Sequence, residues 1–386
     1  MSEDMKLTDL REKIDSIDSD LLRLFQERMD IVSQVAEHKK VSSLPVMDQQ
    51  REAQILKWIS QNAKPEHESQ ARILYDMIFE LSRSHQRLSL RQGASELNQK
   101  IKTAIQTTPP LFPEQATVAC QGVMGAYAEW AAKRLFKQPN IQYLKTYDAV
   151  FSAVENGFCK YGVLPLENST AGSVNKVYSL MNEREFYIVR SLRLKVDHNL
   201  AAPEGVKIKD IREVISHEQA LAQCAGYLEK LGSNIKLTQC ENTATAAEMV
   251  AASGRSDIAA ICSRECTRLY GLECLDSDIQ DRMNNYTRFI CISKNLEIYP
   301  GADRTSIMMT LPHVPGSLYK ALGRFYALGV NLDKLESRPL PERDFDFMFY
   351  LTLVTSVYSD SFAKIMDEVQ EFCVDFEYLG SYSEVI

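Results

Sequence analysis

The chain has 386 residues, of which 45% are hydrophobic and 25% charged, and its formal net charge is −8. These values are typical of a globular protein with a substantial core, and the length predicts two or three domains. The negative charge argues against a general surface for nucleic acid or anionic membranes. No stretch approaches the roughly 20 apolar residues of a membrane-spanning helix, and the N-terminal segment MSEDMKLTDLREK lacks the apolar run of a secretory signal.

The nine cysteines include no CxxC pair and no nearby histidines that would suggest a metal site. Free, mostly buried thiols in the reducing cytoplasm are therefore expected. An acidic protein that binds an anionic metabolite has to concentrate its few cations locally, so arginines and lysines in unusual places are informative.

The first ninety residues predict three long helices. From Leu7 to Lys40 there is no proline or glycine, and apolar residues recur every three or four positions, which is typical of one helical face. Two more helices are expected near 49–62 and 66–91, with a break around Asn62–Pro65. A first helix of about 34 residues is roughly 50 Å long, so much of it would be bare unless two chains intertwine as a dimer.

Three cations lie on this first predicted helix. Arg28 and Lys39 are about three whole turns apart, so both point the same way, with stems roughly 16 Å apart. A small dianion could bind between them. Arg11 lies roughly 25 Å before Arg28 along the helix, and it can reach the same ligand only from a dimer partner. The alternative is that all three are cations flanking a coiled coil.

The segments LREKID at 10–15, ERMDIV at 27–32, HKK at 38–40 and VMDQQRE at 46–52 resemble the all-helical class of chorismate mutase. The resemblance implies that Arg28 and the partner's Arg11 hold the two substrate carboxylates, and that Lys39 and Gln86 donate to the breaking ether oxygen. It further implies that Glu52 and Asp48 contact the ring hydroxyl and the loop, with Arg51 and Ser82 in support. The reaction has no nucleophile and no proton transfer, so the enzyme can only hold the compact conformer and stabilise growing charge.

The pattern changes after a polar, proline-containing boundary near 109–113. Short apolar runs at 117–120, 161–166, 213–216, 258–262 and 289–293 alternate with helical stretches. This alternation predicts an α/β region with a sheet covered by helices on both faces. Segments 122–125 and 167–173 follow predicted strands and should open helices, where small polar residues either cap the helix or bind a carboxylate.

The motifs QGVMGAYAEWAA at 121–132, VLPLENSTAGSV at 163–174, SHEQALAQC at 216–224, NTATAAEMV at 242–250 and NNYTRF at 284–289 resemble prephenate dehydratases. The resemblance implies a two-lobed fold like a periplasmic binding protein, with a second lobe at about 195–275. Thr287 is its key residue, as a positioned donor to the leaving hydroxyl. The implied cleft lining is Glu167, Asn168, Ser169, Thr170, Ser216, Gln219 and Thr243.

Three further positions of this region are ambiguous or depart from the family pattern. Arg288 either binds a carboxylate or pairs with an acidic neighbour, and His217 either tunes protonation or is structural. Many relatives have Ser or Thr where Ala128 follows Tyr127, so the role of that position is in doubt, but not the activity.

The last eighty residues predict strand, helix, strand, strand, helix, strand, with the second strand at 331–339 and the third at 344–354. This order is that of a ferredoxin-like α+β unit. PGSL at 315–318 and LESRP at 335–339 resemble the phenylalanine-binding motifs of ACT domains attached to dehydratases. The resemblance implies that Gly316, Ser317 and Leu318 bind the effector, and that Glu336, Ser337 and Arg338 lie in a loop where a dimer neighbour closes over the ring. The alternative is a plain oligomerisation domain.

Together these features predict four segments: a helical mutase domain at 1–92, a linker at 93–115, a dehydratase domain at 116–296 and an ACT domain at 302–386. The expected protein is a cytoplasmic homodimer or homotetramer that converts chorismate to prephenate and prephenate to phenylpyruvate, inhibited by L-phenylalanine. Neither step requires a metal or an organic cofactor. The alternatives are a non-catalytic metabolite sensor and a dehydratase whose mutase domain is inactive.

Overall fold

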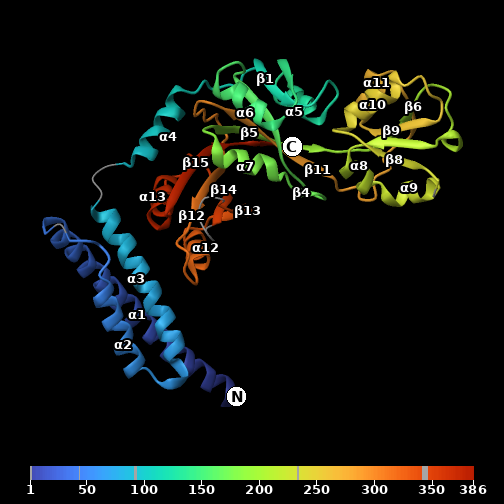
Figure 1. Cartoon of the computed structure of the whole chain (residues 1–386). Helices are drawn as coiled ribbons and strands as arrows, with labels where there is room; N and C mark the ends of the chain where they lie inside the picture. Colours follow the sequence, from blue (N-terminus) through green and yellow to red (C-terminus); the bar gives the residue numbers. More distant parts are fainter. Residues whose placement is uncertain (1, 43, 91–93, 233, 341–346) are drawn as a thin grey trace. The chain divides into compact units, whose positions relative to one another are not determined.

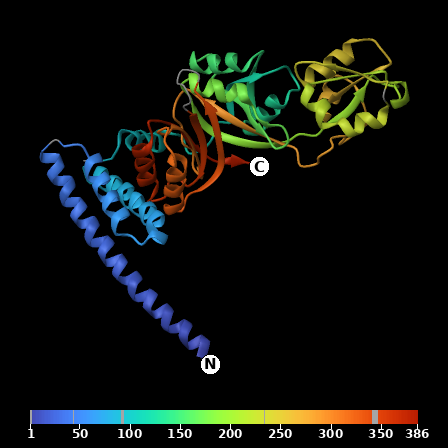
Figure 2. The same cartoon turned by 60° about the horizontal axis from the view of Figure 1, so that its bottom comes forward.

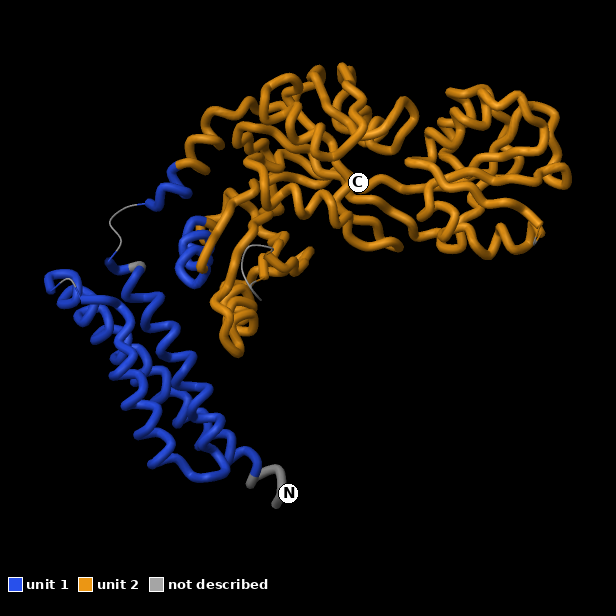
Figure 3. The backbone as a smooth tube through the Cα atoms, in the orientation of Figure 1, with its two compact units in different colours: residues 1–99, 363–373 blue, residues 100–362, 374–386 orange. Residues whose placement is uncertain are grey.

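The computed structural model describes residues 2–42, 44–90, 94–232, 234–340 and 347–386. The chain forms two compact units (Figure 3). Unit 1 contains residues 1–99 and 363–373, and unit 2 contains residues 100–362 and 374–386. In the described part of the chain, no helix combines the length and apolar character needed to cross a bilayer.

Unit 1 is built on three helices, as the apolar spacing predicts. They are α1 (Ser2–Val41), α2 (Gln49–Asn62) and α3 (Glu68–Leu90), and a short 3-10 turn (Pro65–His67) follows the break at Asn62–Pro65. The C-terminal half of α1 packs against α3, where Val32 and Ala36 are buried.

The N-terminal half of α1 has no cover in this chain. Every residue from Leu7 to Leu24 is exposed, and in Figure 2 this half extends beyond α2 and α3. Six apolar side chains on it are about half exposed: Leu7, Leu10, Ile14, Ile17, Leu21 and Leu24. A stripe of this size in water costs free energy, so the prediction that one chain leaves the first helix bare is confirmed.

Two further helices border the predicted linker and the C-terminal region. Helix α4 (Glu96–Thr107) occupies much of the predicted linker, and α13 (Phe362–Phe372) belongs largely to unit 1. Asn98 of α4 donates its side-chain N–H groups to the Ala363 carbonyl at 3.0 Å and to Asp367 at 2.9 Å. The predicted boundary at 92 and 93 lies outside the described residues.

The larger lobe of unit 2 is a mixed sheet in the order β16-β5-β11-β3-β1-β2, with β4 paired to β3. Its strands are β1 (Gln115–Gln121), β2 (Gln138–Leu144), β3 (Tyr161–Asn168), β4 (Gly172–Ser173), β5 (Tyr187–Lys195), β11 (Tyr286–Ser293) and β16 (Glu384–Val385). Helices α5 (Tyr127–Leu135), α6 (Tyr147–Glu155) and α7 (Asn175–Glu183) accompany them. Strand β11 runs antiparallel between β3 and β5, which places residues 287–289, the TRF of the NNYTRF motif, in the middle of the sheet.

The smaller lobe is a second sheet in the order β10-β6-β9-β7-β8. Its strands are β6 (Asn199–Ala202), β7 (Glu213–Ser216), β8 (Lys236–Gln239), β9 (Ile258–Cys262) and β10 (Glu273–Asp276). Alternate residues of β9 face two clusters: Ala259 and Ile261 pack with α8 (Glu218–Gln223) and α9 (Ala225–Leu231), and Ile258, Ala260 and Cys262 pack with α10 (Thr243–Ala252). Helix α11 (Arg264–Leu269) completes the lobe (Figure 1). The predicted extent of the second lobe is confirmed.

The third sheet lies in the C-terminal region, in the order β13-β14-β12-β15. It comprises β12 (Arg304–Thr310), β13 (Asn331–Pro339), β14 (Phe347–Val354) and β15 (Asp375–Tyr382), with α12 (Ser317–Ala327) after β12. The predicted element order is confirmed, although residues 344–346 of the expected strand at 344–354 lie outside the described residues.

One face of the third sheet packs on the larger lobe. Met308, Tyr350 and Leu379 share one buried cluster with Leu164 and Val177. At Gly380 the backbone has φ +133° and a Cβ would lie 2.3 Å from the Ile188 carbonyl oxygen, so only glycine permits this approach of β15 to β5. The C-terminal sheet is therefore joined to the larger lobe of unit 2 by a continuous apolar core.

Candidate active sites

The predicted mutase residues gather on the three helices of unit 1. The Arg28 guanidinium on α1 donates a 2.5 Å hydrogen bond to the Ser82 hydroxyl on α3. Partial burial lowers the pKa of Arg28, because its charge is poorly solvated, and an anionic ligand would compensate. Lys39 donates a 2.5 Å hydrogen bond to the Val46 carbonyl in the segment before α2.

Gln86 lies one helical turn after Ser82 on α3, and its side-chain oxygen is buried with no hydrogen-bond partner among the described residues. A buried polar atom without a partner costs free energy, so this position favours a ligand. Glu52 on α2 is instead paired with Arg83 on α3, which also pairs with Glu80. Arg83 was not predicted, because its position on α3 carries no motif of its own.

The remaining predicted mutase residues lie at the surface of unit 1. Asp48 caps α2, accepting a 2.9 Å hydrogen bond from the Arg51 backbone N–H. Arg51 and Arg11 are exposed. Asp48 thus has a structural role in this chain, and Arg11 lies on the bare half of α1, away from the Arg28 and Ser82 pair along the helix.

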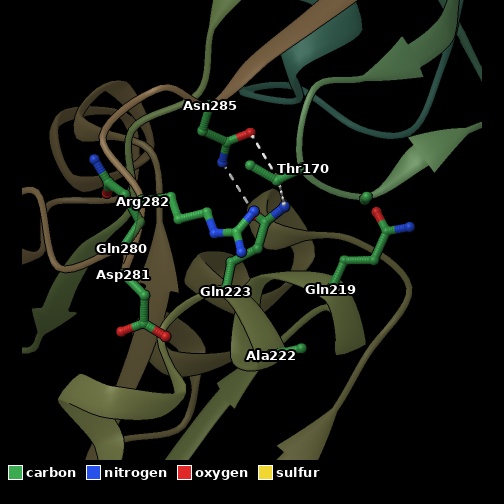
Figure 4. A pocket seen from close by; sticks show the side chains of 9 residues that line it. Thr170, Gln219, Ala222, Gln223, Gln280, Asp281, Arg282 and Asn285 are labelled. Atoms are coloured by element: carbon green, nitrogen blue, oxygen red, sulfur yellow. Dashed lines mark hydrogen bonds between the residues drawn. The ribbon is translucent and has the colours of Figure 1, made fainter.

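The dehydratase cleft lies where the chain crosses between the two lobes of unit 2. It crosses after β5 and returns before β11, and His198 and Asn285 lie on these two connections. Two cavities open here. One, of about 450 Å³, is lined by Asn168, Thr243 and Thr287, among others. The second, of about 310 Å³, is lined by Thr170, Gln219, Gln223, Gln280, Arg282 and Asn285 (Figure 4).

Asn168 is the centre of a polar network in this cleft. Its side-chain N–H₂ donates to the Thr287 hydroxyl at 3.0 Å and to the Asn285 side-chain oxygen at 2.7 Å. Its side-chain oxygen accepts from the Thr170 backbone N–H at 3.0 Å and from the Ala171 backbone N–H at 2.9 Å. Asn168 therefore ties the segment after β3 to Thr287 at the start of β11.

Three members of the network were not predicted from the sequence. Gln223 donates to the Thr170 hydroxyl at 2.7 Å, and its side-chain oxygen accepts from Asn285 at 3.1 Å. His198 lies 2.8 Å from the same Gln223 oxygen, and burial lowers the pKa of His198. Gln223 and Asn285 lie within the quoted motifs SHEQALAQC and NNYTRF, so a reading of every polar motif position would have found them.

Not every predicted cleft residue reaches a cavity. Ser216 is buried and donates to the Ile261 carbonyl at 2.6 Å, and the Ser169 hydroxyl donates to the Asn284 carbonyl at 2.9 Å. The segment 167–173 does not open a helix directly, since β4 pairs back onto β3 and α7 begins only at Asn175. His217 caps α8 through a 3.2 Å hydrogen bond from the Gln219 N–H to its ring and also lines the larger cavity.

Arg288 is held by three carboxylates. Its guanidinium lies 2.7 Å from Glu167, 2.8 Å from Asp333 and 2.8 Å from Glu384. Neither Arg288 nor Glu167 lines either cavity of the cleft. Of the two interpretations of Arg288, the structure favours pairing with acidic neighbours. Glu167 also accepts from Lys334 on β13 at 2.6 Å.

The C-terminal region has a cavity of about 520 Å³ around the start of α12. Gly316, Ser317 and Leu318 line it, together with His313, Phe347 and Phe349. Gly316 has φ +84° at the N-cap of α12, a conformation that favours glycine. The predicted residues of the first effector motif thus border a partly apolar cavity at a helix N-terminus.

The second effector motif lies elsewhere. The expectation of a loop is wrong for Glu336, Ser337 and Arg338, which are on strand β13 because this segment pairs with β14. Glu336 accepts from the Ser173 hydroxyl at 2.8 Å and pairs with Arg338 at 2.7 Å. Arg338 also donates to Asn175 at 2.6 Å. Both charged side chains therefore contact the dehydratase lobe.

Comparisons with known proteins agree with this layout. Residues 10–87 match the family "chorismate mutase type II" and residues 118–297 match "prephenate dehydratase". A bifunctional chorismate mutase/prephenate dehydratase from Aquifex aeolicus is 30% identical over 99% of both chains. The arogenate dehydratase/prephenate dehydratase 2 of Arabidopsis thaliana is 38% identical over 69% of this chain and 72% of its own.

A solved structure is similar as well. A prephenate dehydratase from Arthrobacter aurescens, in complex with L-Phe, superimposes with a TM-score of 0.64 at 26% identity. The match covers 69% of this chain and 90% of that one. The similarity to the Aquifex protein spans both matched segments, so this chain belongs to the bifunctional chorismate mutase/prephenate dehydratase family.

Proposed function

We propose that unit 1 rearranges chorismate to prephenate and that the cleft of unit 2 converts prephenate to phenylpyruvate. The observation that carries the second step is the Asn168 side chain, which donates a 3.0 Å hydrogen bond to Thr287 at the cavity wall. Family membership supports both steps, and the polar groups on α1 and α3 support the first.

In the first step a C–O bond breaks while a C–C bond forms, and negative charge grows on the ether oxygen. Arg28 holds one substrate carboxylate in a bidentate pair, aligned by Ser82. Lys39 and the side-chain N–H₂ of Gln86 donate to the ether oxygen. Glu52, oriented by Arg83, contacts the ring hydroxyl. Asp48 and Arg51 hold the start of α2 that carries Glu52.

The mutase site is complete only in a dimer. Arg11 lies on the same helix as Arg28 but roughly 25 Å away, so it reaches the substrate only as Arg11 of the partner subunit. The bare apolar half of α1 supports this arrangement, because a second α1 would cover it. A homodimer or homotetramer is the proposed assembly.

In the second step the ring carboxylate leaves as CO₂, its bonding electrons enter the ring, and hydroxide departs and takes up a proton to form water. The Thr287 hydroxyl oxygen accepts a hydrogen bond from the Asn168 side-chain N–H₂. This orients the hydroxyl proton of Thr287 into the cavity, toward the leaving hydroxyl of the substrate. Thr170, Gln219 and Thr243 complete the polar wall, and Ser169 and Ser216 hold it in place. Ala128 also lines the larger cavity and contributes no hydroxyl there.

One assay tests both activities: chorismate is supplied, and prephenate and phenylpyruvate are quantified separately. We expect the wild type to form phenylpyruvate and Thr287→Ala to accumulate prephenate, with the dehydratase kcat reduced about 10²- to 10³-fold, the usual cost of one positioned donor. Thr287→Ser keeps the hydroxyl and should retain most activity. Normal phenylpyruvate output from Thr287→Ala would refute the role of Thr287, and no turnover by the wild type would leave the metabolite-sensor alternative.

The C-terminal α+β region is proposed as an ACT domain that binds L-phenylalanine. Its sheet order and element order are those of a ferredoxin-like unit, and the solved Arthrobacter relative contains L-Phe. The cavity at Gly316, Ser317 and Leu318 lies at the N-terminus of α12, which favours a carboxylate, and it offers Phe347 and Phe349 to an aromatic ring. Glu336 and Arg338, which flank Ser337 on β13, then link this domain to the dehydratase lobe through Ser173 and Asn175.

Phenylalanine inhibits by binding one state of the dehydratase more tightly than the other. The test is to add millimolar L-phenylalanine and to measure dehydratase turnover and melting temperature; a change in neither would refute the proposal.

The dehydratase domain is proposed to have a fold like that of periplasmic binding proteins, because it has two sheets with a cleft between them. The reducing cytoplasm is the proposed compartment, in keeping with nine free cysteines of which six are buried.

A further inference from the structure

The dehydratase cleft contains few cations for a substrate with two carboxylates. Among the described residues that line its two cavities, Arg282 is the only arginine or lysine. Arg288, next to Thr287 in sequence, is not available, because Glu167, Asp333 and Glu384 surround its guanidinium at 2.7–2.8 Å. A dianion that enters this cleft therefore has one guanidinium to pair with.

Arg282 is placed to meet a ligand. It lies on the connection that returns the chain from β10 to β11, and its side chain extends toward Gln223 in the middle of the cavity lining (Figure 4). It is exposed and has no hydrogen-bond or ion-pair partner within the described part of the chain. Asp281, the carboxylate that lines the same cavity, instead accepts the Gly226 backbone N–H through both oxygens at 3.2 Å.

The space in front of Arg282 is continuous with the space in front of Thr287. Ala171, Gln219 and Gln223 line both cavities. Arg282 and Thr287 are five positions apart in the sequence, which limits their Cα separation to about 17 Å even in a fully extended chain. A small molecule with charged groups at its two ends can thus touch both residues.

The chemistry decides which carboxylate Arg282 binds. The ring carboxylate has to leave as CO₂, and a guanidinium paired with it would stabilise the reactant more than the transition state. The described residues that line the cavity around Thr287 include no arginine or lysine, which suits the loss of the ring carboxylate as CO₂. A cation farther along the cleft suits the carboxylate of the side chain, which does not react.

We propose that Arg282 binds the side-chain carboxylate of the dehydratase substrate and selects the 2-oxo acid prephenate over its amino acid counterpart arogenate. The inference rests on the proposed dehydratase function. Arogenate has an ammonium group beside the same carboxylate, so its attraction to a guanidinium is weaker at this short range. The name of the Arabidopsis relative includes both arogenate and prephenate as substrates, so discrimination between the two is relevant to proteins similar to this chain.

The test compares Arg282→Gln and Arg282→Lys with wild type, using prephenate and arogenate as separate substrates. Loss of one charge-assisted pair should raise the KM for prephenate about 10- to 100-fold, with kcat within about threefold, because the contact is the same in ground and transition states. The KM of Arg282→Lys for prephenate should lie between those of the wild type and Arg282→Gln, since lysine keeps the positive charge but lacks the two parallel N–H donors of a guanidinium. The KM for arogenate should change less than that for prephenate.

Two controls separate this role from a structural one. Mutase turnover in the same preparation should not change, and Arg268→Gln, a substitution of an exposed arginine on α11 that pairs with Glu265, should leave both dehydratase constants unchanged. An unchanged KM for prephenate in Arg282→Gln would overturn the proposal, as would a fall in kcat at constant KM or an equal loss for both substrates. If the wild type does not convert prephenate at all, the proposed function fails instead.

Discussion

Asn168 donates one hydrogen bond to Thr287 over 3.0 Å and accepts the backbone N–H groups of Thr170 and Ala171 on its other side-chain atom. One amide thus holds both the turn after β3 and the hydroxyl at the start of β11. The two halves of its function can be separated by mutation, because they use different atoms of the same group.

Asn168→Asp replaces the donor N–H₂ with an acceptor and keeps the oxygen that closes the turn. We expect the dehydratase kcat to fall about 10²-fold or more, because Thr287 loses its alignment and a negative charge enters the cleft. Folding should be nearly unaffected, since the turn hydrogen bonds remain. Steady-state kinetics and thermal unfolding measure the two effects, and Asn168→Ala, which removes the turn bonds as well, should also lower the melting temperature. An active Asn168→Asp enzyme would contradict this role.

Lys39→Ala should remove the mutase activity and leave the dehydratase intact. Its ammonium is the proposed donor to the breaking ether oxygen, so kcat/KM for chorismate should fall at least about 100-fold. The measurement is chorismate consumption together with prephenate dehydration by the same sample. Lys40→Ala is the matched control, because the neighbouring Lys40 is exposed on α1. Retained mutase turnover in Lys39→Ala would exclude the assignment.

Ile17→Glu places a charge in the middle of the apolar stripe of α1, where Ile17 is 59% exposed in the single chain. If a second α1 covers the stripe, the charge would be buried at the interface. We therefore expect weaker self-association by analytical ultracentrifugation and a loss of mutase activity. Ser19→Glu, on the opposite face of the same helix turn, should do neither. A variant that stays dimeric and active would show that the stripe is not the interface.

Glu377 on β15 gives a pH-dependent prediction. Burial, followed by the charge of Glu185, raises the pKa of Glu377 to about 7. The folded state then holds more protons than the unfolded state between pH 4.5 and 7, so the stability contribution of this group falls as pH rises through that window. Glu377→Gln should raise the melting temperature at pH 8 by about 2–4 °C, as roughly 1 kcal/mol does for a domain of 150–250 residues.

The benefit of Glu377→Gln should vanish near pH 4, where the carboxyl is protonated in both states. Calorimetry at pH 4 and pH 8 makes the comparison. Glu185→Gln removes only the repulsion, so its effect at pH 8 should be smaller than that of Glu377→Gln. An equal gain at both pH values would mean that the effect is not electrostatic.

Local patterns predicted much of the fold. The three-residue and four-residue apolar spacing identified α1, and helices were also predicted at 49–62 and 66–91, where α2 and α3 lie. The short apolar runs identified β7 and β9 with their observed bounds. Period and propensity are properties of consecutive residues, so the sequence contains them directly. A strand at 331–339 was predicted and is confirmed as β13, whereas the expectation of a loop at Glu336 and Arg338 was wrong. Their contacts with Ser173 and Asn175 were not predicted, because they join segments that are distant in sequence.

The cleft shows the same division between local and distant information. Asn168, Thr170, Gln219 and Thr287 could be selected from the sequence because they lie in motifs at strand ends. His198 and Arg282 lie outside the quoted motifs, and they become part of the site because the two connections that carry them cross between the lobes.

The sequence by itself determined the helical and α/β regions, because these follow from periodicity, and its motifs indicated the family. The distance between Arg11 and Arg28 along one helix predicts a second chain at the mutase site. Only the tertiary structure decided which charges are available. Arg288 is enclosed by carboxylates from β3, β13 and β16, whereas Arg282 faces a cavity. Whether a cation is paired with carboxylates or available to a ligand depends on residues that are distant in sequence, and tertiary packing brings these residues together.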